Sequence, residues 1–129
     1  MLDTNICIYL IKQQPPSVLE RFLSHPVGDI GISSITVAEL DYGASKSRHA
    51  SKNRMALDHF IAPLDVAAFD REAASAYGRI RAALEQKGTP IGAMDLLIAA
   101  HALSLGVRLV TNNTREFRRV SGLKVENWV

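Results

Sequence analysis

The sequence has one cysteine, no long apolar run and almost no net charge, and each shortage excludes a class of protein. Cys7 cannot form an internal disulfide, and its place inside an apolar run suits a small buried side chain in a reducing cytoplasm. The longest uninterrupted apolar run, Ile6 to Ile11, has six residues and is far too short to cross a membrane. No basic stretch leads into an apolar run and a small-residue cleavage site, so we expect no secretory signal.

The residues that two other kinds of active site require are also missing from the sequence. Cysteine and histidine pairs at zinc spacing are absent, which argues against a zinc centre. No serine or threonine is accompanied by a histidine that an acid orients, so a nucleophilic triad is not evident. His101 stands six residues after Asp95, on a different face of the helix expected there, and we interpret it as a packing or surface histidine.

What the sequence does contain is an ordinary globular composition, with 47% apolar and 22% charged residues among 129 and a net charge of only +2. A chain of this length can bury one substantial core. It contains no internal repeat, low-complexity tract or recognisable linker. We therefore expect a single domain over residues 1–129.

Short apolar strands alternate with helices along the chain. Strands are expected at residues 1–2, 29–33, 64–66, 107–111 and 123–127, and helices at 5–12, 15–24, 34–45, 46–62, 69–87 and 94–105, with a helical turn at 114–120. This alternation predicts an α/β fold, with a central, twisted, mostly parallel sheet of four to five short strands flanked by helices. In such sheets, ligands collect outside the carboxyl ends of the strands.

Acidic and polar residues follow several of these strands. Asp3 follows the first strand, and Glu39 lies on the helix after the second. Residues 111–116 follow the strand that ends at 111, and Asp95 begins an apolar helix that can reach the same edge of the sheet. Because the carboxyl ends of parallel strands meet at one edge, we expect these groups to converge.

Each acid also has a purely structural explanation. These are an N-cap for Asp3, a capping box with Thr36 for Glu39, the helix dipole for Asp95 and a solvated charge for Glu116. Several carboxylates meeting without a cation would, however, repel one another, and some would have to stay protonated. Mg²⁺ would remove that repulsion, because a hard divalent cation prefers oxygen ligands.

Two stretches of the chain are rich in positive charge. Residues 46–54 hold four basic residues and no acid, and residues 115–124 hold four against Glu116 alone. Such stretches can follow a phosphate backbone, although solvated helix faces would explain them equally well. A metal held by acids beside basic patches suggests phosphodiester hydrolysis, in which the metal activates a water and neutralises charge on the scissile phosphate.

Four motifs, in family order, resemble those of the PIN-domain ribonucleases, and more narrowly of the VapC toxins of bacterial VapBC toxin–antitoxin pairs. They are MLDTN at the start, then SSITVAELDYGA, GTPIGAMDLLIAAHA and LVTNNTREF, and together they span almost the whole chain. The resemblance implies a compact α/β/α fold with a central parallel sheet, and an endoribonuclease that depends on Mg²⁺, with Mn²⁺ as a substitute. Among VapC toxins, the chain is most similar to the enterobacterial type, which cuts initiator tRNA in the anticodon stem-loop and so inhibits translation.

The resemblance also implies partners. It implies a cytoplasmic homodimer, without membrane association, that a VapB antitoxin neutralises by laying its C-terminal tail across the acidic pocket. It further implies larger toxin–antitoxin assemblies that bind operator DNA through the antitoxin. The apolar faces of residues 5–24 and 46–62 are candidates for binding the antitoxin, or are ordinary core.

Carried over residue by residue, the resemblance assigns catalytic and metal-binding roles to Asp3, Glu39 and Asp95. The supporting polar positions of the family are matched by Thr4, Asn5 and Thr111. The candidates for holding the RNA backbone are Lys46, Arg48, Arg115, Arg118 and Arg119.

The chain departs from the family pattern in two places. Many members carry a fourth acid two residues after the threonine that Thr111 matches. This chain has Asn113 at that position, and Glu116 stands three residues further on. Asn113 and Glu116 are both candidate metal ligands, and Glu116 is also a candidate catalytic acid. Whether a second metal binds is left open, because the Asn113 amide brings no charge. In family members, the first strand also usually begins a few residues further from the aspartate that Asp3 matches. The sequence therefore predicts either that the chain starts at an internal methionine or that its first strand is unusually short.

Two other functions stay open. A non-catalytic PIN-fold module that binds RNA or protein would explain Asn113. A phosphatase with Asp3 as nucleophile would need a second aspartate two residues later, where the chain has Asn5.

Overall fold

The strands form one parallel sheet whose middle strand is a single residue. The computed structural model describes all of residues 1–129, and its strands are β1 (Gly31–Ser33), β2 (Asp65–Ala67), β3 (Leu109–Val110) and β4 (Val125–Glu126). β1 pairs with β2 and β3 pairs with β4, while Leu2 forms parallel bridges to both Ile32 and Val110. The order is therefore β2-β1-Leu2-β3-β4, all parallel, which confirms the predicted sheet of four to five short strands.

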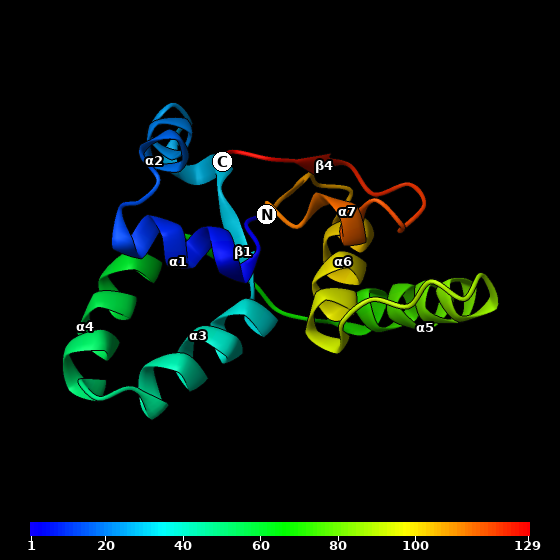
Figure 1. Ribbon diagram of the computed structural model, residues 1–129, viewed down its shortest axis with the longest axis horizontal. Helices are drawn as coiled ribbons and strands as arrows, with labels where there is room; N and C mark the ends of the chain where they lie inside the picture. Colours follow the sequence, from blue (N-terminus) through cyan, green and yellow to red (C-terminus); the bar gives the residue numbers. More distant parts are fainter.

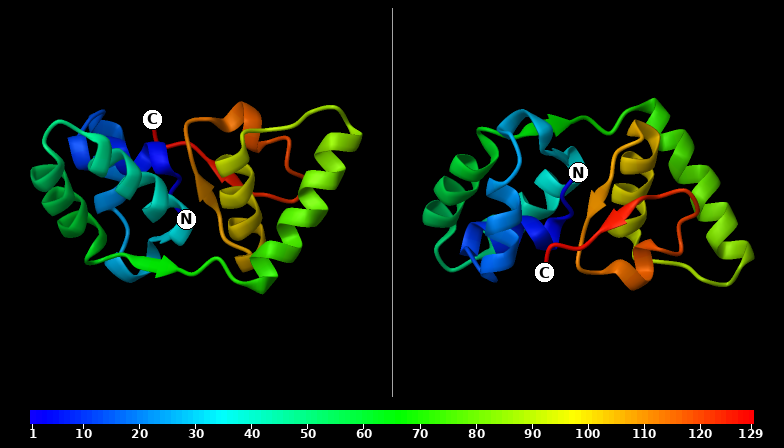
Figure 2. Two further views of the ribbon diagram at one scale, coloured as in Figure 1. Left: turned by 90° about the horizontal axis from the view of Figure 1, so that it is seen from below. Right: turned by 90° about the horizontal axis from the view of Figure 1, so that it is seen from above.

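Helices cover both faces of this sheet (Figures 1 and 2). They are α1 (Thr4–Lys12), α2 (Pro16–Leu23), α3 (Ser34–Lys46), α4 (Ala50–Ile61), α5 (Arg71–Gln86), α6 (Ala93–Leu105) and α7 (Thr114–Phe117), with a 3₁₀ turn η1 (Val27–Asp29) before β1. Helices α1 to α4 lie on one side of the strands and α5 and α6 on the other, as Figure 2 shows. None of the helices combines the length and the apolar character that a bilayer crossing requires.

The two faces of the sheet bury separate hydrophobic clusters. One cluster joins α1, α2 and α4 to the sheet through Leu2, Ile32 and Val110, and the other joins α5 and α6 to it through Leu109. Phe117, which is fully buried, anchors the short α7 to the second cluster. Burial on both faces explains why the strands are apolar throughout rather than alternating.

The direction of the chain reverses at the centre of the sheet. After Leu2 the chain builds β1 and then β2 outward on one side, and it returns to build β3 and β4 on the other. Neighbouring connections therefore leave the carboxyl edge in opposite directions on the two sides of Leu2, which opens a crevice there. Asp3, the next residue, lies at this crevice.

Local sequence explains most of the element boundaries, but the structure corrects two predictions. The helix predicted over 46–62 begins only at Ala50, because residues 47–49 form the turn between α3 and α4 and Lys46 ends α3. The N-cap of α3 is Ser33, whose Oγ accepts a hydrogen bond from the Ile35 amide at 3.0 Å. Three predicted strands are also shorter than expected. β1 begins only at Gly31, because η1 takes up Asp29, and β3 and β4 have two residues each.

Gly31 is required where β1 meets β2. A Cβ at this position would lie 2.8 Å from the carbonyl oxygen of Asp65, closer than side-chain atoms can approach a backbone oxygen. The absence of a side chain therefore lets the two strands pair in register.

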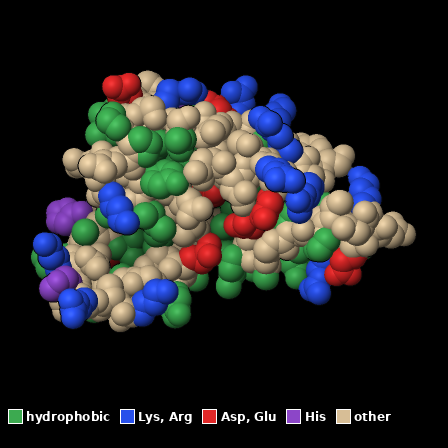
Figure 3. Space-filling view, viewed as in Figure 1, with side chains coloured by type: hydrophobic (Ala, Val, Ile, Leu, Met, Phe, Trp, Pro, Cys, Tyr) green, Lys and Arg blue, Asp and Glu red, His purple; other side chains and the backbone are tan.

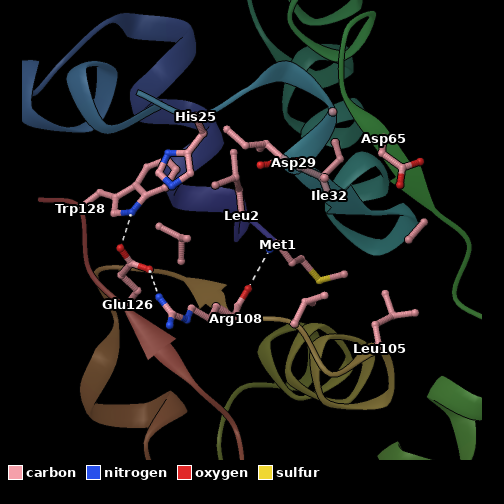
Figure 4. A pocket seen from close by; sticks show the side chains of 16 residues that line it. Met1, Leu2, His25, Asp29, Ile32, Asp65, Leu105, Arg108, Glu126 and Trp128 are labelled. Atoms are coloured by element: carbon pink, nitrogen blue, oxygen red, sulfur yellow. Dashed lines mark hydrogen bonds and ion pairs between the residues drawn. The ribbon is translucent and has the colours of Figure 1, made fainter. Parts of the chain in front are cut away.

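A hollow of about 460 Å³ lies at the opposite, amino-terminal end of the sheet (Figure 4). Trp128 stacks on His25 and donates a hydrogen bond to Glu126, which also pairs with Arg108. The Met1 amino group donates to the Arg108 carbonyl at 2.8 Å. None of the predicted site residues lines this hollow, so it is separate from the acidic edge.

Candidate active site

Asp3 lies at the centre of the carboxyl edge of the sheet. Its amide donates to the Val110 carbonyl at 2.9 Å, which fixes it directly beyond the middle strand. Its carboxylate is only 3% exposed, and one oxygen accepts a hydrogen bond from the Ile6 amide at 2.9 Å. Asp3 is therefore the N-cap of α1, as its structural explanation predicted, while it also faces the other acids.

Burial raises the pKa of Asp3 above its ordinary value, because the charged carboxylate loses solvation. A hydrogen bond from the Thr111 hydroxyl lowers it, as does the bond from the Ile6 amide, because both stabilise the charged form. The nearby charge of Glu39 raises it again, and a bond from the Asn5 amide lowers it. Thr111, itself fully buried, is thus a direct partner of Asp3.

Thr4 connects the first strand to Glu39. Its hydroxyl donates to Glu39 Oε1 at 2.6 Å and lies 3.4 Å from the hydroxyl of Thr36. Thr36 is fully buried one turn before Glu39 on α3, where its spacing from Glu39 predicted only a capping role. One oxygen of Glu39 is therefore occupied, and its other oxygen accepts no hydrogen bond from the protein.

Asp95, Asn113 and Glu116 meet on the other side of the crevice. Asp95 lies in the first turn of α6, and Glu116 lies in α7. The Asn113 side-chain amide donates to Glu116 Oε2 at 3.1 Å and reaches Asp95 Oδ2 at 3.4 Å. Its backbone amide donates to Thr111 Oγ1 at 2.9 Å, which ties this loop to the hydroxyl beside Asp3.

The acids repel one another across this space. The pKa of Asp95 is raised to about 6, chiefly by burial. The charges of Asp3, Glu116 and Glu39 add to the rise, and the hydrogen bond from Asn113 opposes it. Four acids from four separate segments therefore lie within electrostatic range of one another at one edge of the sheet, as Figure 3 shows for the acidic side chains between α3 and α7.

The donor atoms at this edge suit a hard cation, but they do not form a complete coordination site. All four acids offer oxygen, yet no three Asp, Glu, His or Cys side chains of the chain are arranged so that they could hold a metal ion by themselves. Mg²⁺ fits such a site, because it keeps several waters and uses one or two carboxylates with substrate phosphate. Asn113 turns its amide nitrogen toward the acids, so ligation through its oxygen would require the amide to rotate.

His101 is buried and connects the two helices that carry Glu39 and Asp95. The imidazole is 1% exposed, and its Nδ1 lies 2.8 Å from the hydroxyl of Ser33, the N-cap of α3. Phe69 packs edge-on against the ring at 5.4 Å between centroids. Burial lowers the pKa of His101, which favours the neutral ring, and the tautomer sets which partner donates in its hydrogen bond with Ser33. The interpretation of His101 as a packing histidine agrees with this burial.

The five basic candidates lie on both sides of the acidic edge. Arg48 is exposed in the turn between α3 and α4, and Arg115 and Arg118 are exposed on and after α7. Arg119 is half-buried and donates to the Pro90 carbonyl at 3.0 Å, which secures the loop that leads to Asp95. Figure 3 shows Lys and Arg side chains over both regions, flanking the acids.

Comparisons with known proteins agree with this combination of a parallel α/β sheet and acids at its carboxyl edge. A model of the PIN domain matches residues 1–123. The tRNA(fMet)-specific endonuclease VapC of Shigella flexneri is 50% identical over 128 residues, which cover 99% of this chain and 96% of the relative.

Two solved structures share the whole fold. VapBC2 from Rickettsia felis bound to a promoter DNA fragment matches with a TM-score of 0.92 and 43% identity, covering 100% of this chain and 98% of that one. DNA-bound VapBC from Salmonella typhimurium matches with a TM-score of 0.92 and 47% identity, covering 100% and 97%. The chain belongs to the PIN-domain family and, within that family, to the VapC ribonucleases.

Proposed function

We propose that this protein is a divalent-metal-dependent endoribonuclease, the toxin of a VapB–VapC pair, and that it cuts initiator tRNA in the anticodon stem-loop to stop translation. The observation that carries the proposal is the convergence of Asp3, Glu39, Asp95 and Glu116 at the switch point of the sheet. Membership of the VapC ribonucleases supports the reaction, and the name of the Shigella flexneri relative supports the tRNA target.

The acids would hold Mg²⁺, or Mn²⁺ in its place. Bound there, the ion would supply a water of lowered pKa and neutralise charge on the scissile phosphate. Asp3 and Asp95 are the proposed direct ligands, because they are the two acids of the cluster whose pKa is raised, chiefly by burial. Glu39, which keeps one oxygen without a hydrogen bond, and Glu116 would orient waters of the ion and the attacking water.

The neutral side chains keep the carboxylates in place. Thr4 holds one oxygen of Glu39, and Thr111 holds Asp3. Asn113 bridges Asp95 and Glu116 and so offsets part of their repulsion. Asn5, exposed on the first turn of α1, would help to position the metal or a water.

An apolar groove of about 320 Å³ between α1, α3 and α4 is the proposed seat of the VapB antitoxin. Ile8, Ile11 and Leu57 line it, and Glu39 lies at its border. A segment of the antitoxin could therefore fill the groove with apolar side chains and reach the acids with a basic one. We further propose a cytoplasmic homodimer that binds operator DNA through the antitoxin. The structures of VapBC complexes bound to DNA support the DNA partner.

Cleavage of tRNA by the purified chain tests the proposal. We expect one discrete cut in initiator tRNA with Mg²⁺ or Mn²⁺, its loss with EDTA, and its loss in Asp3→Asn with the fold retained. Sequencing of the cut ends would locate the bond. An active Asp3→Asn protein would refute the assigned role of Asp3.

The same reactions separate the two other functions. RNA retained without cleavage at any metal concentration would favour a binding module. Phosphate released from small phosphoesters, with RNA left intact, would favour a phosphatase in which Asp3 is the nucleophile.

A further inference from the structure

The exposed face of α3 carries an aromatic side chain beside the acidic edge. Tyr42 is 66% exposed, so a ligand can reach its ring. Lys46 extends over this ring, with its Nζ 4.7 Å from the ring centroid. Glu39, Tyr42 and Lys46 follow at intervals of three and four residues, so they lie on one face of the helix.

We propose that Tyr42 and Lys46 form a binding platform for an unpaired nucleotide next to the cleaved bond, with the base stacked on Tyr42 and a neighbouring phosphate paired with Lys46. The inference rests on the proposed ribonuclease function and specifies its substrate: the RNA must be unpaired at this nucleotide. A ring next to a cation is a suitable combination for single-stranded RNA, because any base can stack on the ring and the cation neutralises the backbone.

The surroundings of the pair favour RNA over another protein. Lys46 forms no ion pair, and the nearest ion pair on α3 joins Asp41 to Arg54. The Lys46 charge is therefore free for a phosphate. The pair also lies outside the apolar groove, whose α3 residues are Glu39, Leu40, Gly43 and Ala44. The platform continues the acidic site along α3, and Figure 3 shows Lys and Arg side chains close to the acids on this side.

Equilibrium binding tests the platform independently of cleavage. Fluorescence anisotropy with the full chain in EDTA would compare an RNA oligonucleotide that is unpaired around the cut site with the same segment held in a duplex. We expect Tyr42→Ala to weaken binding of the unpaired RNA about tenfold, in the range measured for one stacked base. Tyr42→Phe should stay within about twofold of the wild type, because it keeps the ring. Duplex binding should be equal in all three.

Two further readouts identify the contacts. A 2-aminopurine at each position beside the cut in turn should be quenched at one position by the wild type and Tyr42→Phe, and not by Tyr42→Ala. Lys46→Met should reduce the slope of log affinity against log salt by about one, as expected for one lost phosphate contact. Met55→Ala, at a residue that is 65% exposed on α4, is the matched control and should bind as the wild type does.

Separate results overturn the platform and the proposed function. Unchanged RNA affinity in Tyr42→Ala refutes the platform even if the wild type cleaves RNA. Unchanged affinity together with a change of mass in light scattering would assign Tyr42 to an interface between protein chains. A wild type that binds through Tyr42 but never cleaves RNA keeps the platform and refutes the ribonuclease.

Discussion

Neutralising Asp95 should stabilise the protein in the absence of metal. The pKa of Asp95 is raised from its ordinary 3.8 to about 6, chiefly by burial and then by the charges of Asp3, Glu116 and Glu39. Because the folded pKa lies above the unfolded one, the folded state binds the proton more tightly. Stability from this proton is complete below about pH 4 and is lost as the pH rises through about 6, so the ionised cluster destabilises the fold at neutral pH.

The size of the effect follows from the two pKa values. A rise from 3.8 to about 6 corresponds to about 3 kcal/mol at about 1.4 kcal/mol per pH unit. Asp95 is only half-buried, so solvent screening reduces this to about 1.5 kcal/mol. The Asp95 charge also favours the N-terminus of α6 by about 0.5 kcal/mol, which its removal forfeits. Asp95→Asn should therefore gain about 1 kcal/mol at pH 7.5, on the order of 3–5 °C in Tm.

Urea unfolding in EDTA at pH 4, 5, 6 and 7.5 measures this gain. The midpoint of Asp95→Asn should exceed that of the wild type at pH 7.5 and approach it at pH 4, with an unchanged slope. Asp41→Asn is the control, because it removes an exposed acid paired with Arg54 and should lower stability by no more than about 1 kcal/mol. Adding Mg²⁺ should stabilise the wild type more than Asp95→Asn. A variant that is no more stable at pH 7.5, or a gain independent of pH, would refute the repulsion among the acids.

Three other substitutions test the site and the groove. Ser33→Ala should cost about 1–3 kcal/mol in urea unfolding, because it removes the α3 cap and leaves the buried His101 nitrogen unpaired; a neutral result would show that this bond is dispensable. Glu116→Ala should reduce RNA cleavage more than Asn113→Ala in steady-state assays, since only Glu116 brings a charge, and the reverse order would make Asn113 the better fourth ligand. Ile11→Asp should weaken VapB binding at least about tenfold by calorimetry, because it places a charge in the apolar groove; an unchanged Kd would move the antitoxin elsewhere.

Much of the fold was predictable because its signals are local. Pro16 at the start of α2 and Gly106 after α6, with a φ of 67°, mark helix ends by their own backbone chemistry. Apolar runs bounded by polar turns marked the strands, although the sequence overestimated their lengths. The start of α4 was wrong by four residues, because the basic run from Lys46 onward has no signal that separates a helix from a turn.

The candidate site was predictable only in outline. The acids could be named from their places after strands, and the resemblance to VapC toxins selected among them. Their roles remain predictions. No local feature of the chain indicates that Asn113 turns its nitrogen toward Asp95 and Glu116. Nor does any local feature indicate that Ser33 bonds His101 from 68 residues away.

The sequence by itself determined the helices, the short apolar strands and the supply of oxygen-bearing side chains, because backbone preference and apolar spacing act over a few residues. Tertiary structure decided which of those side chains meet. Thr4 reaches Glu39 across 35 residues only because Leu2 lies between β1 and β3. The raised pKa of Asp95 depends on three acids that the folded sheet brings near it. Charge repulsion falls off with distance through space and not along the chain, so it exists only once the strands have paired.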